Sequence, residues 1–161
     1  MPKEKEFRTV RGYQLVKQSS GRELTPSMED YLEMIYRTCQ QTPSVRVNML
    51  AEQLNVQAPS VSRTVRRLAE KGYVSYQRYG EIELTPKGQS LGQYLLQRHE
   101  TIEQFLRNLG VTRSLLVETE LIEHYLSRDT VSALEVWNAF LTANADVLSR
   151  FAQFRQTYTN K

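Results

Sequence analysis

Cysteine is almost absent from this 161-residue sequence. Cys39 stands alone, so no disulfide can form within one chain. No apolar run approaches the roughly 18 residues that a membrane-spanning helix needs. The charged start lacks the apolar stretch of a secretory signal. We therefore expect a cytoplasmic protein that does not contact membranes. Histidine is also scarce, with His99 and His124 as the two copies.

Apolar residues make up 40% of the sequence and charged residues 24%, which allows a core within a soluble protein. The net charge is +3 and the isoelectric point is near 9.0, which permits nucleic-acid binding without requiring it. Residues 46–88 hold seven Lys and Arg against four Asp and Glu, whereas residues 89–161 hold seven against eight. The first 25 residues hold six against three. The basic excess is thus confined to the start and the middle of the chain.

Hydrophobic spacing predicts the order of the elements. We interpret residues 1–24 as a flexible arm. A helix begins near residues 25–27, capped by Thr25 or Ser27, and ends at 40–44. A short helix over 46–54 and a connector at 55–57 precede a second helix over about 58–71, which Gly72 stops. Two strands, 73–78 and 81–84, form a β-hairpin. Helices follow at about 85–108, 112–127, 130–142 and 143–157.

This order is typical of a winged helix-turn-helix over residues 25–88, followed by a helical part over 89–161. The fold class is therefore mostly α with a small β-hairpin. In such domains the third helix enters the major groove of DNA and the hairpin touches the backbone. Three apolar residues, Val61, Val65 and Leu68, would hold that helix against the other two.

The opposite face of this helix, with the hairpin, carries the candidate DNA contacts: Pro59, Ser60, Ser62, Arg63, Thr64, Arg66, Arg67 and Arg78. Arg63 is suited to a paired contact with guanine. Arg66, Arg67, Lys71 and Arg78 are better placed for phosphates, which give affinity but little sequence information. Taken singly, an arginine here equally fits an ordinary solvated helix face.

Acidic residues and histidines recur at helical spacing. Glu120, Glu123 and His124 lie on one helix face, and Asp30 with Glu33 lie on one face of the first helix. His99 belongs to the long helix. Taken alone, Asp30 with Glu33 is more often a solvated helix face, and a lone histidine such as His99 is more often structural. The Glu-x-x-Glu-His spacing is a moderate signal for a metal site, since acid–base pairs four residues apart also occur on exposed helices. Sequence alone does not bring the three helices together.

Dispersed motifs in order resemble one family. They are residues 25–33 (TPSMEDYLE), 59–62 (PSVS), 84–88 (LTPKG), 98–100 with 103–106 (RHE, EQFL) and 122–124 (IEH). Together they cover about residues 24–142 and resemble the manganese transport regulators of the diphtheria-toxin-repressor family. The resemblance implies a two-ion site built from Asp30, Glu33, His99, Glu120, Glu123 and His124.

That family implies a manganese(II)-activated repressor that binds double-stranded operator DNA as a homodimer and controls manganese transport genes. Members of its iron branch use sulfur ligands at two places that here hold Asp30 and Glu120, and oxygen and nitrogen ligands favour the harder Mn²⁺. Two Mn²⁺ ions per subunit are expected, although Fe²⁺, Zn²⁺, Co²⁺ and Cd²⁺ also bind such ligands. The metal would tie the first helix to the dimerisation part. About 24 residues precede the first helix, and no room remains for the SH3-like third domain of iron-type members.

Two further hypotheses stay open. One is a dimeric winged-helix repressor that responds to iron, or that works without metal and responds to a small molecule or to nothing. The other is a di-metal carboxylate enzyme, but no nucleophile or substrate motif accompanies the ligands, so we expect neither catalysis nor a small-molecule substrate. The apolar residues of the helical part serve either the core or a two-fold interface, and Cys39 is interpreted as a buried apolar residue.

Overall fold

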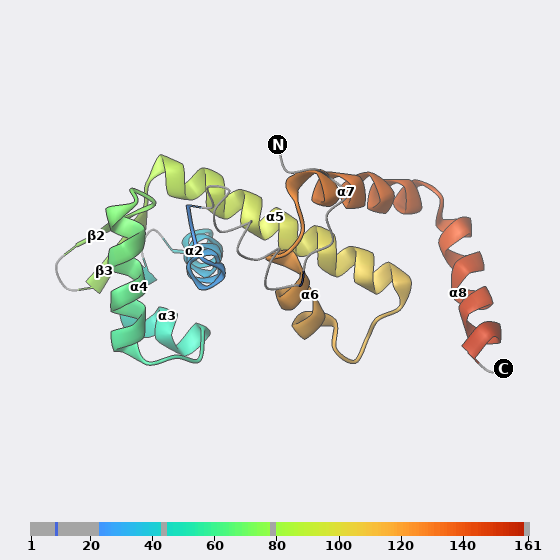
Figure 1. Cartoon of the computed structure of the whole chain (residues 1–161), viewed down its shortest axis with the longest axis horizontal. Coiled ribbons are helices and arrows are strands. Elements are labelled where there is room, and N and C mark those ends of the chain that lie inside the picture. Colours follow the sequence, from blue (N-terminus) through green and yellow to red (C-terminus); the bar gives the residue numbers. More distant parts are fainter. Residues whose placement is uncertain (1–8, 10–22, 43–44, 78–79, 160–161) are drawn as a thin grey trace.

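The computed structural model describes residues 9, 23–42, 45–77 and 80–159. The elements are α2 (Pro26–Cys39), β1 (Val45–Arg46), α3 (Val47–Gln53), α4 (Ala58–Glu70), β2 (Val74–Tyr76), β3 (Glu81–Leu84), α5 (Pro86–Leu109), α6 (Leu115–Glu123), α7 (Arg128–Ala143) and α8 (Ala145–Thr159). Figure 1 shows α5 running from the winged helix-turn-helix at one end to α6 and α7 at the other. The predicted fold class, mostly helical with a small sheet, is confirmed.

The first core lies between α2, α3, α4 and the sheet, and α5 contributes to it. The three apolar residues predicted to hold α4, Val61, Val65 and Leu68, are fully buried. From α5, Leu95 packs into the same cluster. The N-terminal half of α5 is therefore part of the winged domain, and the predicted boundary after residue 88 falls inside one continuous helix.

The sheet has three strands rather than the two of the predicted hairpin. Its order is β1-β3-β2, and both pairs are antiparallel. Val45 of β1 pairs with Ile82 of β3, on the edge opposite β2. A strand of two residues is too short to show an alternating pattern, so β1 could not be predicted from periodicity. Residues 78 and 79 of the predicted wing, Arg78 among them, lie outside the described residues.

The helix ends follow local capping chemistry. Thr25, not Ser27, caps α2: its hydroxyl accepts the Met28 N–H at 3.3 Å. Gly110 ends α5 in the left-handed region, at φ +83°. The helix predicted over 112–127 is shorter, because Ser127 caps α7 by accepting the Thr130 N–H. The chain therefore turns at residues 124–127, and α7 begins at Arg128.

The end of the predicted N-terminal arm is packed against the winged domain. Leu24 is buried in the first core. Glu23 accepts a hydrogen bond from the Tyr73 hydroxyl at 2.5 Å and pairs with Lys87 at 2.6 Å. Residues 1–8 and 10–22, the rest of this arm, lie outside the described part of the chain. None of the helices in the described part is long and apolar enough to span a membrane.

A glycine sets the distance between α2 and α5. A Cβ atom added at Gly92 would lie 2.6 Å from the Cβ of Tyr36. Real Cβ atoms do not approach so closely, so the two helices can cross here only because Gly92 lacks a side chain. The same crossing brings the candidate ligands of α2 toward those of α5.

Replacing this glycine tests the crossing. Alanine normally stabilises a helix interior by about 0.5–1 kcal/mol relative to glycine. At this position overpacking dominates, so we expect Gly92→Ala to lower the free energy of unfolding by about 1–3 kcal/mol. Urea denaturation in the presence of chelator measures the free energy of unfolding, and Gln93→Ala on the exposed side of α5 is the control. A stabilised Gly92→Ala protein would show that the helices do not depend on this contact.

Candidate metal centre and nucleic-acid interface

Three helices meet at one buried cluster. From α2 come Asp30 and Glu33, one turn apart; α5 presents His99; and α6 ends with Glu120, Glu123 and its capping residue His124. Glu33, His99 and His124 are each less than a tenth exposed, and Glu123 is 1% exposed. All six residues predicted as ligands thus lie around one place, which no single helix could have revealed.

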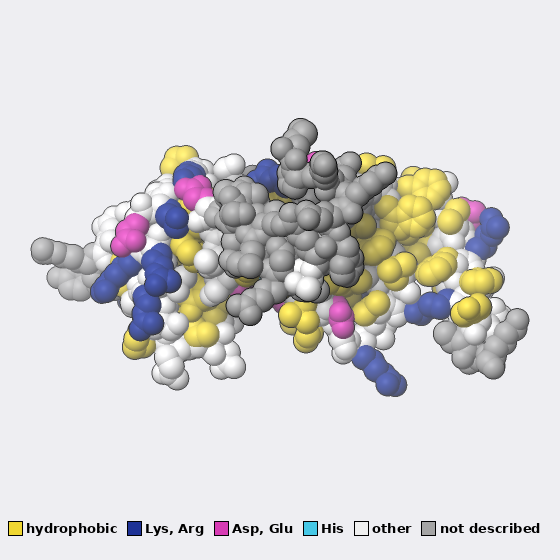
Figure 2. Space-filling model, viewed as in Figure 1, with side chains coloured by type: hydrophobic (Ala, Val, Ile, Leu, Met, Phe, Trp, Pro, Cys, Tyr) yellow, Lys and Arg dark blue, Asp and Glu magenta, His cyan; other side chains and the backbone are white. Residues whose placement is uncertain are grey.

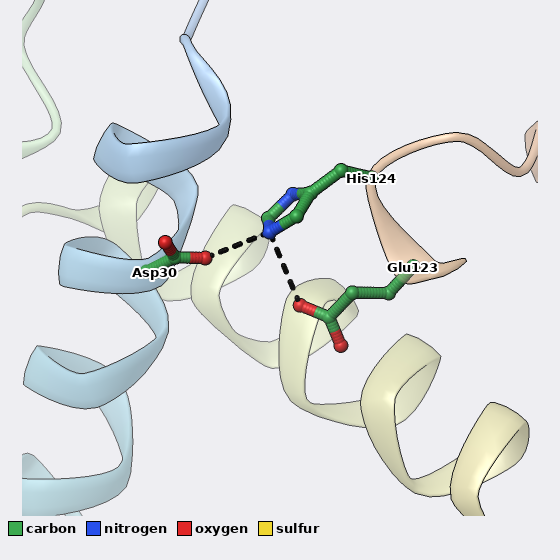
Figure 3. Close-up of side chains that lie close together, drawn as sticks. All are labelled: Asp30, Glu123 and His124. Atoms are coloured by element: carbon green, nitrogen blue, oxygen red, sulfur yellow. Dashed lines mark ion pairs between the residues drawn. The ribbon is translucent and has the colours of Figure 1, made fainter. Parts of the chain in front are cut away.

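One half of the cluster joins α2 to the end of α6. Nε2 of His124 lies 2.9 Å from Oδ1 of Asp30 and 3.8 Å from Oε1 of Glu123. Figure 3 shows the Asp30 and Glu123 side chains approaching the same ring nitrogen from different helices. One oxygen or nitrogen atom from each of these three residues lies within 4.8 Å of the others, a spacing that suits a cation.

The other half surrounds His99. Its Nδ1 lies 2.9 Å from Oε2 of Glu123 and 3.9 Å from Oε1 of Glu33. Oε1 of Glu120, a half-exposed residue, is 3.7 Å away. Glu33, His99 and Glu123 form a second group with ligand atoms within 4.8 Å. Glu123 belongs to both groups, because its two oxygens face different imidazoles.

Burial and like charges perturb the titration of this cluster. Burial, and then the neighbouring Glu123 charge, raise the pKa of both Glu33 and Glu120. The hydrogen bond to Glu123 raises the pKa of His99 against the effect of burial. Burial alone would lower the pKa of His124, but Asp30 and Glu29 outweigh it and raise this pKa to about 9. The carboxylates therefore compete for positive charge.

The residues fit a divalent cation. The donors are carboxylate oxygens and imidazole nitrogens, the ligands of ions harder than those that select thiolates. Oδ1 of Asp30 is buried, yet within the described part of the chain it accepts no hydrogen bond of good geometry. A buried carboxylate oxygen whose hydrogen bonding is left incomplete is an atom that a cation could bind.

Sequence reasoning missed two members of this region. Arg98 is buried and pairs with Glu29 at 3.0 Å and with Glu123 at 3.3 Å. Glu29 also lies 3.1 Å from Nδ1 of His124. Each of the two directly precedes a predicted ligand, Asp30 or His99. No pattern in a single sequence separates such a buried charged pair from a solvated one.

The candidate DNA contacts lie on the outer face of α4. Of the residues predicted there, Pro59, Ser60, Arg63, Arg66 and Arg67 are exposed, while Ser62 and Thr64 are half-buried. Figure 2 shows Lys and Arg side chains gathered over this side of the molecule, at the end away from α8. The face is thus free to approach a polyanion.

A winged helix-turn-helix, joined by one long helix to a buried carboxylate–imidazole cluster, defines a class: metal-dependent DNA-binding transcriptional regulators. Two family models match the chain: "Iron dependent repressor, N-terminal DNA binding domain" over residues 23–82, and "Iron dependent repressor, metal binding and dimerisation domain" over residues 85–150. The chain belongs to this iron-dependent repressor family, also known as the diphtheria toxin repressor family, whose members are transcriptional regulators and not enzymes.

Similar proteins agree with this assignment. The HTH-type transcriptional regulator MntR of Lysinibacillus sphaericus (strain C3-41) is 39% identical over 127 residues, which cover 78% of this chain and 91% of that protein. The solved structure of the manganese regulator SloR is 34% identical, with a TM-score of 0.62 over 71% of this chain and 54% of that one. A manganese-dependent transcriptional repressor complexed with manganese is 32% identical, with a TM-score of 0.62 over 70% and 53%. This chain spans about half the length of these two solved chains.

The raised pKa of His124 predicts how stability depends on pH without metal. The folded pKa of about 9 lies above the usual 6.5. The stabilisation is therefore complete below about pH 6.5 and is lost as the pH rises through 9. We expect the difference in unfolding free energy between the wild type and His124→Asn, measured with urea in chelator, to shrink from pH 7 to pH 9.5. A difference that stays constant would contradict protonation of His124 in the metal-free protein.

Proposed function

We propose that this protein is a manganese(II)-responsive repressor that binds operator DNA as a homodimer and controls manganese transport genes. The donor set of oxygen and nitrogen atoms, which favours a hard ion, supports manganese. So do the names of its relatives, a regulator called MntR, the manganese regulator SloR and a manganese-dependent repressor. The observation that carries the proposal is that one buried cluster draws its ligands from both sides of the molecule.

The six predicted ligands divide between two cation positions that share Glu123. Asp30 and His124 complete one position, and Glu33 with His99 complete the other. Glu120 lies beside His99 and is the more exposed of the carboxylates, so it closes the second position from the solvent side. When bound, a divalent ion supplies the positive charge that four carboxylates lack.

Ligation links α2 to α5 and α6. Asp30 and Glu33 stand on α2, whose other face carries Leu32 and Ile35 of the winged-domain core. His99, Glu123 and His124 stand on the dimerisation side. Without the ion, Arg37 and Arg98 offset the charge of these carboxylates only in part. The remaining repulsion holds the winged domain less firmly against the helical part. Neutralising the carboxylates fixes the orientation of α4 relative to a dimer axis, and two recognition helices then match sites about 34 Å apart.

A second copy of the chain is the partner that the helical part fits. Large apolar side chains of this part are 44% to 63% exposed: Leu116 and Leu121 of α6, Trp137 and Phe140 of α7, and Phe154 of α8. Figure 2 shows hydrophobic side chains spread over the end of the molecule that holds α7 and α8. Exposed apolar side chains spread over three helices suit a stable interface, which buries about 800 Å² on each partner. The matching family region is a dimerisation domain.

A binding assay tests the metal switch. Operators are selected from a random duplex library in separate pools with Mn²⁺ and with chelator. Fluorescence anisotropy then follows binding at fixed salt under Mn²⁺, Fe²⁺, Zn²⁺ or chelator, and sedimentation gives the number of chains per complex. We expect Mn²⁺ to tighten operator binding at least about tenfold, equivalent to about 1.4 kcal/mol, with chains bound in pairs.

Each of two matched variants replaces one carboxylate with an amide. Asp30→Asn removes a ligand of α2 and should abolish the Mn²⁺ effect, whereas Glu118→Gln, exposed on α6, should preserve it. Coupling is reciprocal, so operator DNA must raise the Mn²⁺ affinity by the same factor. Equal Mn²⁺ affinity with and without operator would refute the switch. If the operator binds equally well with chelator and with Mn²⁺, the protein is still a DNA-binding protein but the metal switch is refuted.

Two arginines of α4 should separate base reading from phosphate contact. We expect Arg63→Ala to weaken operator binding by about 1–3 kcal/mol and to leave binding to random duplex nearly unchanged, because a paired guanine contact is lost. Arg67→Ala should weaken both, and should lower the slope of log affinity against log salt by about one. Each variant is the control for the other. If Arg63→Ala weakens binding to operator and to random duplex equally, as Arg67→Ala should, then Arg63 contacts the DNA phosphate backbone and not a base.

A further inference from the structure

Behind the six ligands lies a second layer of charge. Arg98 of α5 is 3% exposed, and its guanidinium reaches two carboxylates on different helices. Nη1 donates to Oε2 of Glu29 at 3.0 Å, and Nη2 donates to Oε1 of Glu123 at 3.3 Å. Its Nε has no partner in the described part of the chain. The buried cation is thus directed wholly at these two acidic groups.

Glu29 connects this arginine to an imidazole. The same Oε2 atom that accepts from Arg98 lies 3.1 Å from Nδ1 of His124. The other ring nitrogen, Nε2, faces Asp30 and Glu123. Glu29 and Asp30 are neighbours on α2, so one turn of helix approaches both sides of the same ring. An ionised carboxylate only accepts hydrogen bonds, so Glu29 requires a proton on Nδ1.

We infer that Glu29 and Arg98 are positioning residues of the metal centre, which contribute no ligand atom but fix the orientation and the tautomer of His124. A neutral imidazole that binds a cation keeps one proton, and Glu29 holds that proton on Nδ1 and leaves the Nε2 lone pair for the ion. Arg98 in turn fixes Glu29 and restrains Glu123. Carboxylates that hold the second nitrogen of a ligating histidine raise its basicity and commonly contribute 10–100-fold to metal affinity.

The contacts also cross from one side of the molecule to the other. Glu29 belongs to the winged domain, whereas Arg98 and His124 belong to α5 and to the end of α6. One oxygen of Glu29 therefore holds the three elements together in the same place as the ligands. The planar guanidinium is needed for this, because its two nitrogens reach two partners in a fixed geometry, and an ammonium group does not.

The first test uses the wild-type protein alone. With ¹⁵N-labelled histidine and diamagnetic Cd²⁺, NMR reports which nitrogen of each ring carries the proton, and the chain has only two histidines to assign. We expect the metal-loaded His124 to carry its proton on Nδ1 and to bind Cd²⁺ through Nε2. A His124 ring that binds Cd²⁺ through Nδ1 would overturn the inference.

A variant tests the energetic role. Glu29→Gln should weaken Mn²⁺ binding in the absence of DNA by about 10–100-fold, measured by competition with a fluorescent chelator. Glu100→Gln makes the same change beside His99 on the exposed face of α5, and should bind as the wild type does. Arg98→Lys keeps the charge but not the two-sided contact, and should also weaken binding. Wild-type affinity in both Glu29→Gln and Arg98→Lys would overturn the inference.

A double-mutant cycle separates positioning from general stabilisation. If Glu29 acts through the ring, Glu29→Gln should cause little further loss of affinity in a His124→Asn background, whereas a structural role would add fully. The inference rests on the proposed function. A wild-type chain that binds no Mn²⁺ or Cd²⁺ would defeat both. Wild-type binding, with additive effects of Glu29→Gln and His124→Asn, would defeat only this inference.

Discussion

Compensation of buried negative charge is the constraint on which the rest of the structure depends. Removing a charged group from water costs several kcal/mol, and here carboxylates from α2 and α6 are brought together in a place with little access to solvent. Glu33 takes Arg37 as one partner, at 2.6 Å, and Glu123 takes Arg98 and His99. These partners stabilise the cluster only in part, because the pKa of Glu33 stays raised. A cluster left short of positive charge is one that a bound cation would stabilise.

The cluster of carboxylates lies between the winged domain, which holds α2, and the helical part, which holds α6. The long helix α5 belongs to the winged core through Leu95 and to the helical part through Ile102 and Leu106. One continuous helix therefore packs against α2 on one side and against α6 and α7 on the other. The close crossing at Gly92 brings α2 against α5, and Oε1 of Glu33 on α2 lies 3.9 Å from Nδ1 of His99 on α5.

Local sequence patterns predict much of the fold. The stripe of Val61, Val65 and Leu68 specified the inner face of α4, and Thr25, Thr85 and Gly110 specified helix ends, because capping and periodicity act over a few residues. The two-residue β1 and the short α6 were not predictable in the same way. Strand β1 is defined by its pairing with β3. Helix α6 ends early because Ser127 caps the next helix, α7.

The ligand set shows the same division. Residue types and spacing determined that Glu120, Glu123 and His124 share one helix face, and a family resemblance joined them to Asp30, Glu33 and His99 as expected ligands. Only the tertiary structure decided that α2, α5 and α6 meet, that Glu123 lies between the two imidazoles, and that Arg98 and Glu29 stand behind them. The reason is physical: periodicity fixes directions around one helix axis, whereas distances between helices follow from packing contacts such as Gly92 on Tyr36, which join residues far apart in the chain.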